Sequence, residues 1–166
     1  MAYIDFAYYK NLYKESELSE TEFERFLWDA EREIDKATCG IDNVRKLRVA
    51  FPVDEYDAET VKRSVCALID LLHQIETTEK AANSSIGFIE RADGALQGKL
   101  VSSVSAGNES INYAVGKNAD TAISNAIKDS KSKDIELYRF ISSRLHGIAD
   151  ANGVNLLYSG PYPCAI

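Results

Sequence analysis

The sequence predicts a mainly α-helical fold: a small bundle of four to five helices with an extended arm or β-hairpin inserted before the last helix. Apolar residues recur at helical spacing in four stretches, while polar and apolar residues alternate between about 99 and 115. A length of 166 residues suits one domain. We therefore expect a single domain over 1–166, with a helical core over about 5–83 and 119–152, an arm over about 99–115 and a tail over 154–166.

The first two helices are predicted from their capping residues. Asp5 precedes a short segment with aromatic residues at helical spacing, which predicts a helix over 5–14. Ser19 and Glu22 form an S-x-x-E capping box, and Gly40 stops the pattern that follows. The apolar face of this second helix consists of Phe23, Phe26, Leu27, Ala30, Ile34 and Ala37.

The remaining helices complete the predicted core. Residues 41–56 mix turn and apolar residues, which indicates a packed connection with about one helical turn. Asp57 is expected to cap a third helix, a weaker pattern predicts a helix over 119–127, and the last helix is expected to end near Asn152 and Gly153. The third helix has the stripe Val61, Val65, Leu68, Ile69, Leu72 and Ile75, and the last has Ile135, Leu137, Tyr138, Ile141, Leu145 and Ile148.

The arm is predicted from alternation and turn residues. The sequence Ala106-Gly107-Asn108-Glu109 separates Val104 from the alternating Ile111, Tyr113 and Val115. This pattern predicts a hairpin. Because an isolated hairpin is marginally stable in water, we expect it to need a partner.

Charge and composition exclude several classes of protein. The net charge is −7, and residues 1–90 hold 19 acids against 11 bases, without a cluster of Lys and Arg that would grip DNA phosphates. Cys39, Cys66 and Cys164 are odd in number and lack a CxxC pair, which argues against disulfides and zinc. The first ten residues lack a secretory signal pattern, and no apolar run approaches a membrane span. We expect a soluble protein made in a reducing cytoplasm, with no membrane partner.

Catalytic residues are not evident in the sequence. His73 and His146 lie in helical segments without a recognisable mechanism, and Cys66 is too far from His73 on one helix for activation. We predict no enzyme, no cofactor and no metal site, with Cys66 a core thiol. The enzyme alternative would pair a histidine with Asp70 or Asp150.

Aromatic residues are concentrated at both ends of the chain. Tyrosine suits packing, and it also suits subunit contacts because it combines a stiff apolar body with a hydroxyl group. Its terminal placement favours assembly. The apolar run over 155–160 follows a helix stop and must be covered by its own domain or by a neighbour. The terminal tyrosines are Tyr3, Tyr8, Tyr9, Tyr13, Tyr158 and Tyr162.

Several motifs occur in a specific order: Tyr8-Tyr9-Lys10-x-x-Tyr13, Ile34-Asp35-x-x-Thr38, Val61-Lys62-x-x-Val65-Cys66-Ala67-Leu68, Ser103-Val104-Ser105-Ala106-Gly107-Asn108-x-Ser110-Ile111-Asn112-Tyr113 and Leu156-Leu157-Tyr158-x-Gly160. In this order they resemble the small head-tail connector (head-completion or adaptor) proteins of long-tailed phages and prophages. The sequence departs from that pattern in its longer 86–98 and 118–133 segments and at Ser159, where a basic residue is expected.

The resemblance implies a structural virion protein rather than an enzyme. It implies a helical subunit that forms a closed ring under the portal protein, extends the DNA channel and presents a surface to a tail-completion or stopper protein. Double-stranded DNA would pass without sequence-specific binding. The expected location is the head-tail junction of the virion, reached from the host cytoplasm during assembly.

Two segments are predicted to form the assembly interface, because their apolar patterns need partners. We also hypothesise that carboxylates face the channel and repel DNA. The alternative function is a non-phage cytoplasmic helical module that uses its tyrosines to bind one protein. The predicted interface residues are Val104, Ile111, Tyr113 and Val115 in the arm, and Leu156, Leu157, Tyr158 and Tyr162 in the tail.

Overall fold

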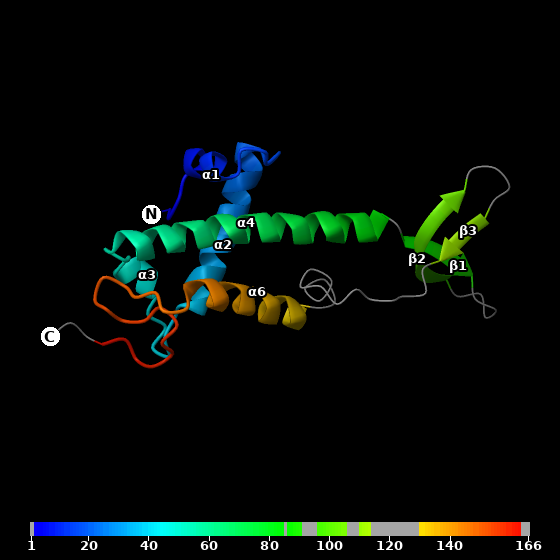
Figure 1. The fold of residues 1–166 in the computed structure, drawn as a ribbon. Coiled ribbons are helices and arrows are strands. Elements are labelled where there is room, and N and C mark those ends of the chain that lie inside the picture. The colour runs from blue at the N-terminus through cyan, green and yellow to red at the C-terminus, as the bar shows by residue number, and fades with distance from the viewer. Residues whose placement is uncertain (1, 85, 91–95, 106–109, 114–129, 164–166) are drawn as a thin grey trace.

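The computed structural model describes residues 2–84, 86–90, 96–105, 110–113 and 130–163. Its helices and strands confirm a mainly α-helical protein (Figure 1). The expected helix over 119–127 lies outside the described residues. In chain order the elements are α1 (Phe6–Leu12), α2 (Glu20–Ala37), α3 (Lys46–Val49), α4 (Glu55–Ser84), β1 (Ile86–Glu90), β2 (Leu96–Ser105), β3 (Ser110–Tyr113) and α6 (Ser130–Leu145).

Both predicted helix caps in the first part of the chain are confirmed. The Asp5 carboxylate accepts a hydrogen bond of 2.7 Å from the Tyr8 backbone N–H. Ser19 and Glu22 form the reciprocal capping box, in which Glu22 Oε2 accepts from the Ser19 N–H at 3.1 Å. Such side chains replace the helical partners that the first N–H groups lack, which contributes about 1 kcal/mol for each cap.

The predicted cap of the long helix α4 was wrong by one turn. Asp54 fills the cap position, because its Oδ1 accepts from the Asp57 N–H at 3.0 Å and its carbonyl accepts from the Ala58 N–H at 2.9 Å. Asp57 lies inside the first turn. Its Oδ2 accepts from the Ala149 N–H at 3.2 Å and so ties the start of α4 to the loop after α6.

The predicted end of the last helix was also wrong. α6 ends at Leu145, and Gly147 follows with φ of +83°. Helices often end at a residue in this left-handed conformation, which glycine adopts without steric cost. The loop beyond is ordered by Asp150, whose Oδ1 accepts from the N–H groups of Asn152 and Val154, both at 2.9 Å. The Asn152-Gly153 pair therefore forms part of a side-chain-stabilised turn rather than the helix end.

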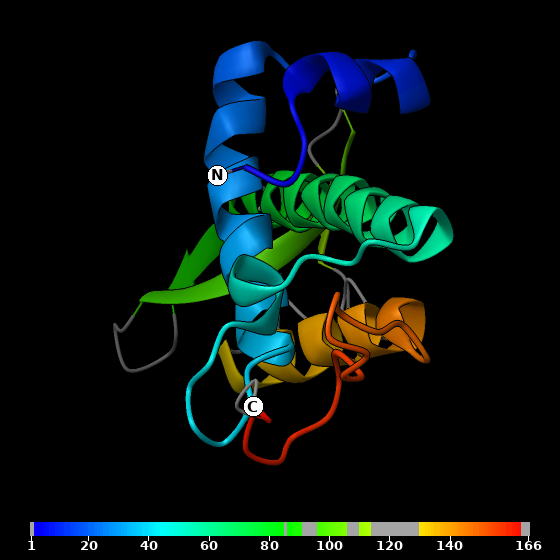
Figure 2. The same ribbon diagram turned by 90° about the vertical axis from the view of Figure 1, so that its left-hand side faces the viewer.

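The core lies where α2, α4 and α6 meet. Figures 1 and 2 show α2 crossing α4 steeply, with α6 beneath α4. The stripe predicted for α4 is confirmed, since all six of its residues are buried. In α6 the prediction was partly wrong: Ile135 and Tyr138 are exposed. The core of these three helices includes Phe23, Phe26, Ile34, Val65, Leu68, Ile69, Leu137, Ile141 and Leu145.

The strands form an antiparallel sheet in the order β1-β2-β3. The first half of β2 pairs with β1, and the second half pairs with β3, where Val104 lies opposite Ile111. Figure 1 shows the sheet beyond the C-terminal end of α4, away from the helices. The connecting residues 106–109 lie outside the described residues, so the hairpin stays a prediction.

Helix length and apolar character together decide whether a membrane can be spanned. Within the described ranges, no helix meets both requirements.

Candidate assembly surfaces

Several large apolar side chains are exposed among the described residues, and three of them lie close together in sequence. Val49 ends α3, Val53 lies in the connection and Tyr56 is the second residue of α4, with exposed fractions of 64%, 82% and 75%. We call these three residues the α3–α4 corner. The others are Trp28, Ile41, Ile135, Tyr138 and Tyr158. A concentration of exposed apolar side chains is typical of contact surfaces.

The surroundings of the corner are acidic. Asp54 and Glu55 are exposed beside Tyr56, and Glu59 lies one turn further along α4. These carboxylates line a hollow next to Tyr56 together with Arg63, which donates to Glu59 Oε1 at 2.8 Å. The corner therefore combines an apolar tip with a negative border.

A second surface is a groove between α4 and α6, with a volume of about 250 Å³. Arg139 stands at its border, pairing with Glu136 at 3.1 Å while remaining largely exposed. The Arg144 guanidinium lies 4.5 Å from the centre of the Phe140 ring. The groove is thus apolar with two arginines beside it. Its lining consists of Leu71, Ile75, Glu136, Leu137, Arg139, Phe140 and Ser143.

The C-terminal tail docks on the turn between α2 and α3. Lys46, which is fully buried, donates from Nζ to the carbonyl oxygens of Leu156, at 3.0 Å, and of Tyr158. Burial lowers the pKa of Lys46 because the charged ammonium loses water. A Cβ at Gly40 would lie 2.7 Å from the Gly160 carbonyl oxygen, so the close approach of the tail needs glycine there.

Polar side chains hold the end of the described tail. Tyr162 donates its backbone N–H to Asp42 Oδ2 at 2.6 Å, and its hydroxyl to Asp150 Oδ2 at 2.5 Å. Asn152 Nδ2 donates to the same hydroxyl oxygen at 2.8 Å. Three elements distant in sequence are thereby joined at one tyrosine.

The predicted tail residues therefore differ in availability. Leu156 is fully buried in the chain's own core, so its expected place in an assembly interface needs correction: the helices of its own domain cover it. Leu157 is half-buried and packs against that core. Tyr162 is also half-buried, and its side chain is engaged in the hydrogen bonds described above. Tyr158 is 48% exposed, and its ring lies 5.8 Å from Lys46 Nζ.

The predicted arm residues are placed only through their backbone. Val104 pairs with Ile111, and Tyr113 pairs with Val101 across β2 and β3. Val115 lies outside the described residues. The predicted arm over about 99–115 overlaps β2 and β3, and its residues 106–109, 114 and 115 lie outside the described residues.

The N-terminal tyrosines pack within the domain rather than standing free for a partner. Tyr9 is fully buried, stacks on Tyr13 with ring centres 5.2 Å apart, and contacts Phe23 at 5.3 Å. Their terminal placement was a poor guide, because α1 folds back onto α2 and α4 and supplies apolar side chains to the core.

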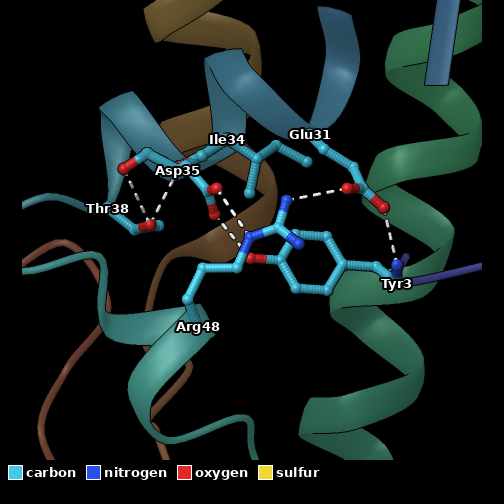
Figure 3. A network of polar contacts seen from close by, with 6 residues as sticks. All are labelled: Tyr3, Glu31, Ile34, Asp35, Thr38 and Arg48. Carbon is cyan, nitrogen blue, oxygen red and sulfur yellow. Dashed lines mark hydrogen bonds and ion pairs between the residues drawn. The ribbon is translucent and has the colours of Figure 1, made fainter. Parts of the chain in front are cut away.

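A polar network fixes the first residues of the chain (Figure 3). Arg48 bridges two nearly buried carboxylates, with Nη2 2.7 Å from Glu31 Oε2 and Nε 2.8 Å from Asp35 Oδ2. Tyr3 donates its N–H to Glu31 Oε1 at 2.6 Å and its hydroxyl to Asp35 Oδ1 at 2.5 Å. Sequence reasoning missed Arg48 because its partners lie 13 and 17 residues away with no local motif.

Cys66, His73 and Asp150, which were considered for catalysis, each pack or hydrogen-bond within the domain. Cys66 is fully buried, which confirms the predicted core thiol, and burial raises its pKa to about 12. His73 contacts the Phe26 ring edge-on at 5.6 Å, and Asp150 is committed to the loop hydrogen bonds described above. Within the part of the chain that the structure describes, no group of three or more His, Cys, Asp or Glu residues is arranged to hold a metal ion.

Comparison with known proteins gave no match: no family model, no curated protein and no solved structure is significantly similar to this chain.

Proposed function

We propose that the protein is a non-enzymatic structural subunit of a phage head-tail connector. Copies of it assemble into a ring under the portal protein, bind a tail-completion or stopper protein on the other side, and join the DNA-filled head to the tail. The observation that carries the proposal is the sheet held beyond the end of the 30-residue helix α4, away from the helical core. The motif order described above supplies the resemblance.

The sheet is suited to contacts between chains. β1 and β3 are its edge strands, each paired with β2 along one side. An edge strand offers backbone N–H and C=O groups to a neighbouring chain. A ring of such subunits gives each arm a neighbour, which satisfies these groups without exposing them in the assembled particle.

The charge of the chain suits a passage for DNA. A net charge of −7 gives a field that repels phosphate groups, so DNA slides past without binding. In the proposed ring, carboxylates face the channel. A ring whose inner wall carries few Asp and Glu residues would contradict this part of the proposal.

The test is negative-stain microscopy of the full chain, alone and mixed with the portal protein of the same phage or prophage. We expect rings on the portal. A matched variant replaces residues 86–113 with a Gly-Ser linker, and is expected to keep its helical circular dichroism but to lose the rings.

Two results would overturn the proposal. One is the absence of any complex between the wild-type chain and the portal. The other is stable binding to an unrelated cytoplasmic protein in place of the portal, which would favour a protein-interaction module outside phage biology.

A further inference from the structure

We propose that one subunit contacts the next by placing its α3–α4 corner in the α4–α6 groove of a second copy. The inference rests on the proposed function, because it names the two faces that meet in the ring. It uses only helical residues and the α3–α4 connection, so it is independent of the arm.

The shapes of the two faces match. Tyr56 and Val53 project from the corner with exposed fractions of 75% and 82%. The groove, at about 250 Å³, has room for one aromatic side chain, and its lining includes the apolar residues Ile75 and Leu137. An aromatic side chain inserted in an apolar pocket is the usual centre of a protein interface.

The charges of the two faces also match. Asp54 and Glu55 stand beside Tyr56, whereas Arg139 and Arg144 stand beside the groove. Only Glu136 is acidic among the groove's lining residues, and it already pairs with Arg139. Opposite charges around an apolar contact steer the approach and fix its orientation.

A chain cannot make this contact with itself. Tyr56 and Leu71 lie on the same helix α4, separated by roughly 22 Å along the axis at 1.5 Å per residue. The corner therefore needs the groove of another copy. Because the two faces differ, each copy uses both, and such a head-to-tail contact closes into a ring when the rotation between copies allows it.

The experiment measures self-association of the full chain by sedimentation velocity, alone and on the portal. Tyr56→Ala is expected to weaken association at least about tenfold, as loss of a central aromatic does. Trp28→Ala is the matched control, since Trp28 is another largely exposed aromatic, at 64% against 75% for Tyr56, on α2. It is expected to leave association unchanged. Circular dichroism checks that both variants fold.

Charge reversal tests the pairing itself. Glu55→Arg and Arg139→Glu are each expected to weaken association, and the double variant is expected to restore it because the two charges exchange places. Equal effects of Tyr56→Ala and Trp28→Ala, or no restoration in the double variant, would overturn the inference.

The outcomes separate this inference from the proposed function. If rings form on the portal equally well with every corner variant, the connector function stands and the proposed contact between copies is wrong. The portal or the tail protein would then be the occupant of the groove. Self-association through the corner without portal binding would support the contact and contradict the connector function. A wild-type chain that neither self-associates nor binds the portal would overturn both.

Discussion

The two ends of the chain are both rich in tyrosine, yet the domain holds them by different means. The N-terminal segment packs aromatic rings into the core, with Tyr9 fully buried. The C-terminal tail also places Leu156 in the core, but it is held in addition through its backbone, by the ammonium group of Lys46 and the carboxylate of Asp42, and it leaves Tyr158 half-exposed. Composition alone thus does not distinguish a packing tyrosine from one available to a partner. The two kinds of tyrosine are distinguished by the residues that each one contacts in the folded chain.

The largest expected loss of stability comes from removing the polar network that holds the N-terminal end. Arg48→Ala leaves Glu31 and Asp35 nearly buried without their shared cation, and we expect it to lower the free energy of unfolding by about 2–3 kcal/mol, below the usual cost for a fully buried pair because Arg48 is partly exposed. Urea denaturation measures the change. Arg63→Ala, at an exposed pair, is the control and is expected to cost under about 1 kcal/mol. Equal losses would contradict the role given to Arg48.

A smaller effect is expected at the other end. Lys46→Met leaves the carbonyl oxygens of Leu156 and Tyr158 without their donor, which costs about 1–2 kcal/mol. Hydrogen exchange should accelerate over residues 155–162, while the amides of α1 keep their protection. Lys10→Met is the control, since that amine donates to the Ser16 carbonyl at the first segment. Uniform acceleration along the chain would show that the tail is not separately attached.

The smallest effect is a dependence on alkaline pH. Burial raises the pKa of Tyr8 and of Cys66 to about 12 each, above their ordinary values of 10 and 9. The unfolded chain therefore loses these protons first, so stability is full below about pH 9 and declines as pH rises toward 12. Lys46, whose pKa burial lowers, acts in the opposite direction.

Urea denaturation at several pH values measures this decline. Tyr8→Phe and Cys66→Ala each remove one group with a raised pKa and should each flatten the curve in part, because the pKa of Tyr3, Tyr9, Tyr13 and Tyr162 is raised as well. A steeper loss of stability with pH in either variant would contradict the attribution of the alkaline decline to Tyr8 in α1 and Cys66 in α4.

Local signals in the sequence predicted the helices well, and non-local contacts account for what it missed. Asp5 and the Ser19–Glu22 box each act within four residues, so the pattern alone located them. Asp54 and Asp57 are both plausible caps in the sequence, and the structure separates their roles: Asp54 accepts from the Asp57 N–H, whereas Asp57 accepts from the distant Ala149 N–H. Gly147 and Gly153 are likewise both helix-stop signals in one short stretch.

The candidate surfaces were harder to predict than the fold. From the sequence Leu156 looks like an uncovered apolar residue, but its side chain is fully buried in a core formed by helices distant in sequence, and Lys46, 110 positions earlier, binds its carbonyl oxygen. The residues of α4 and α6 that line the groove are more than 60 positions apart in the chain, so no spacing reveals it. Exposure of Tyr56 depends in the same way on how α3 meets α4, because its position in the first turn of a helix is compatible with either burial or solvent contact.

The most direct test of the proposed connector function is to remove the gene for this chain from the genome that encodes it and to examine any phage particles that are produced. We expect heads and tails to accumulate separately and infectivity to be lost, and we expect joined particles and infectivity to return when the chain is supplied in trans. Tailed, DNA-filled particles at the normal yield in its absence would contradict the account.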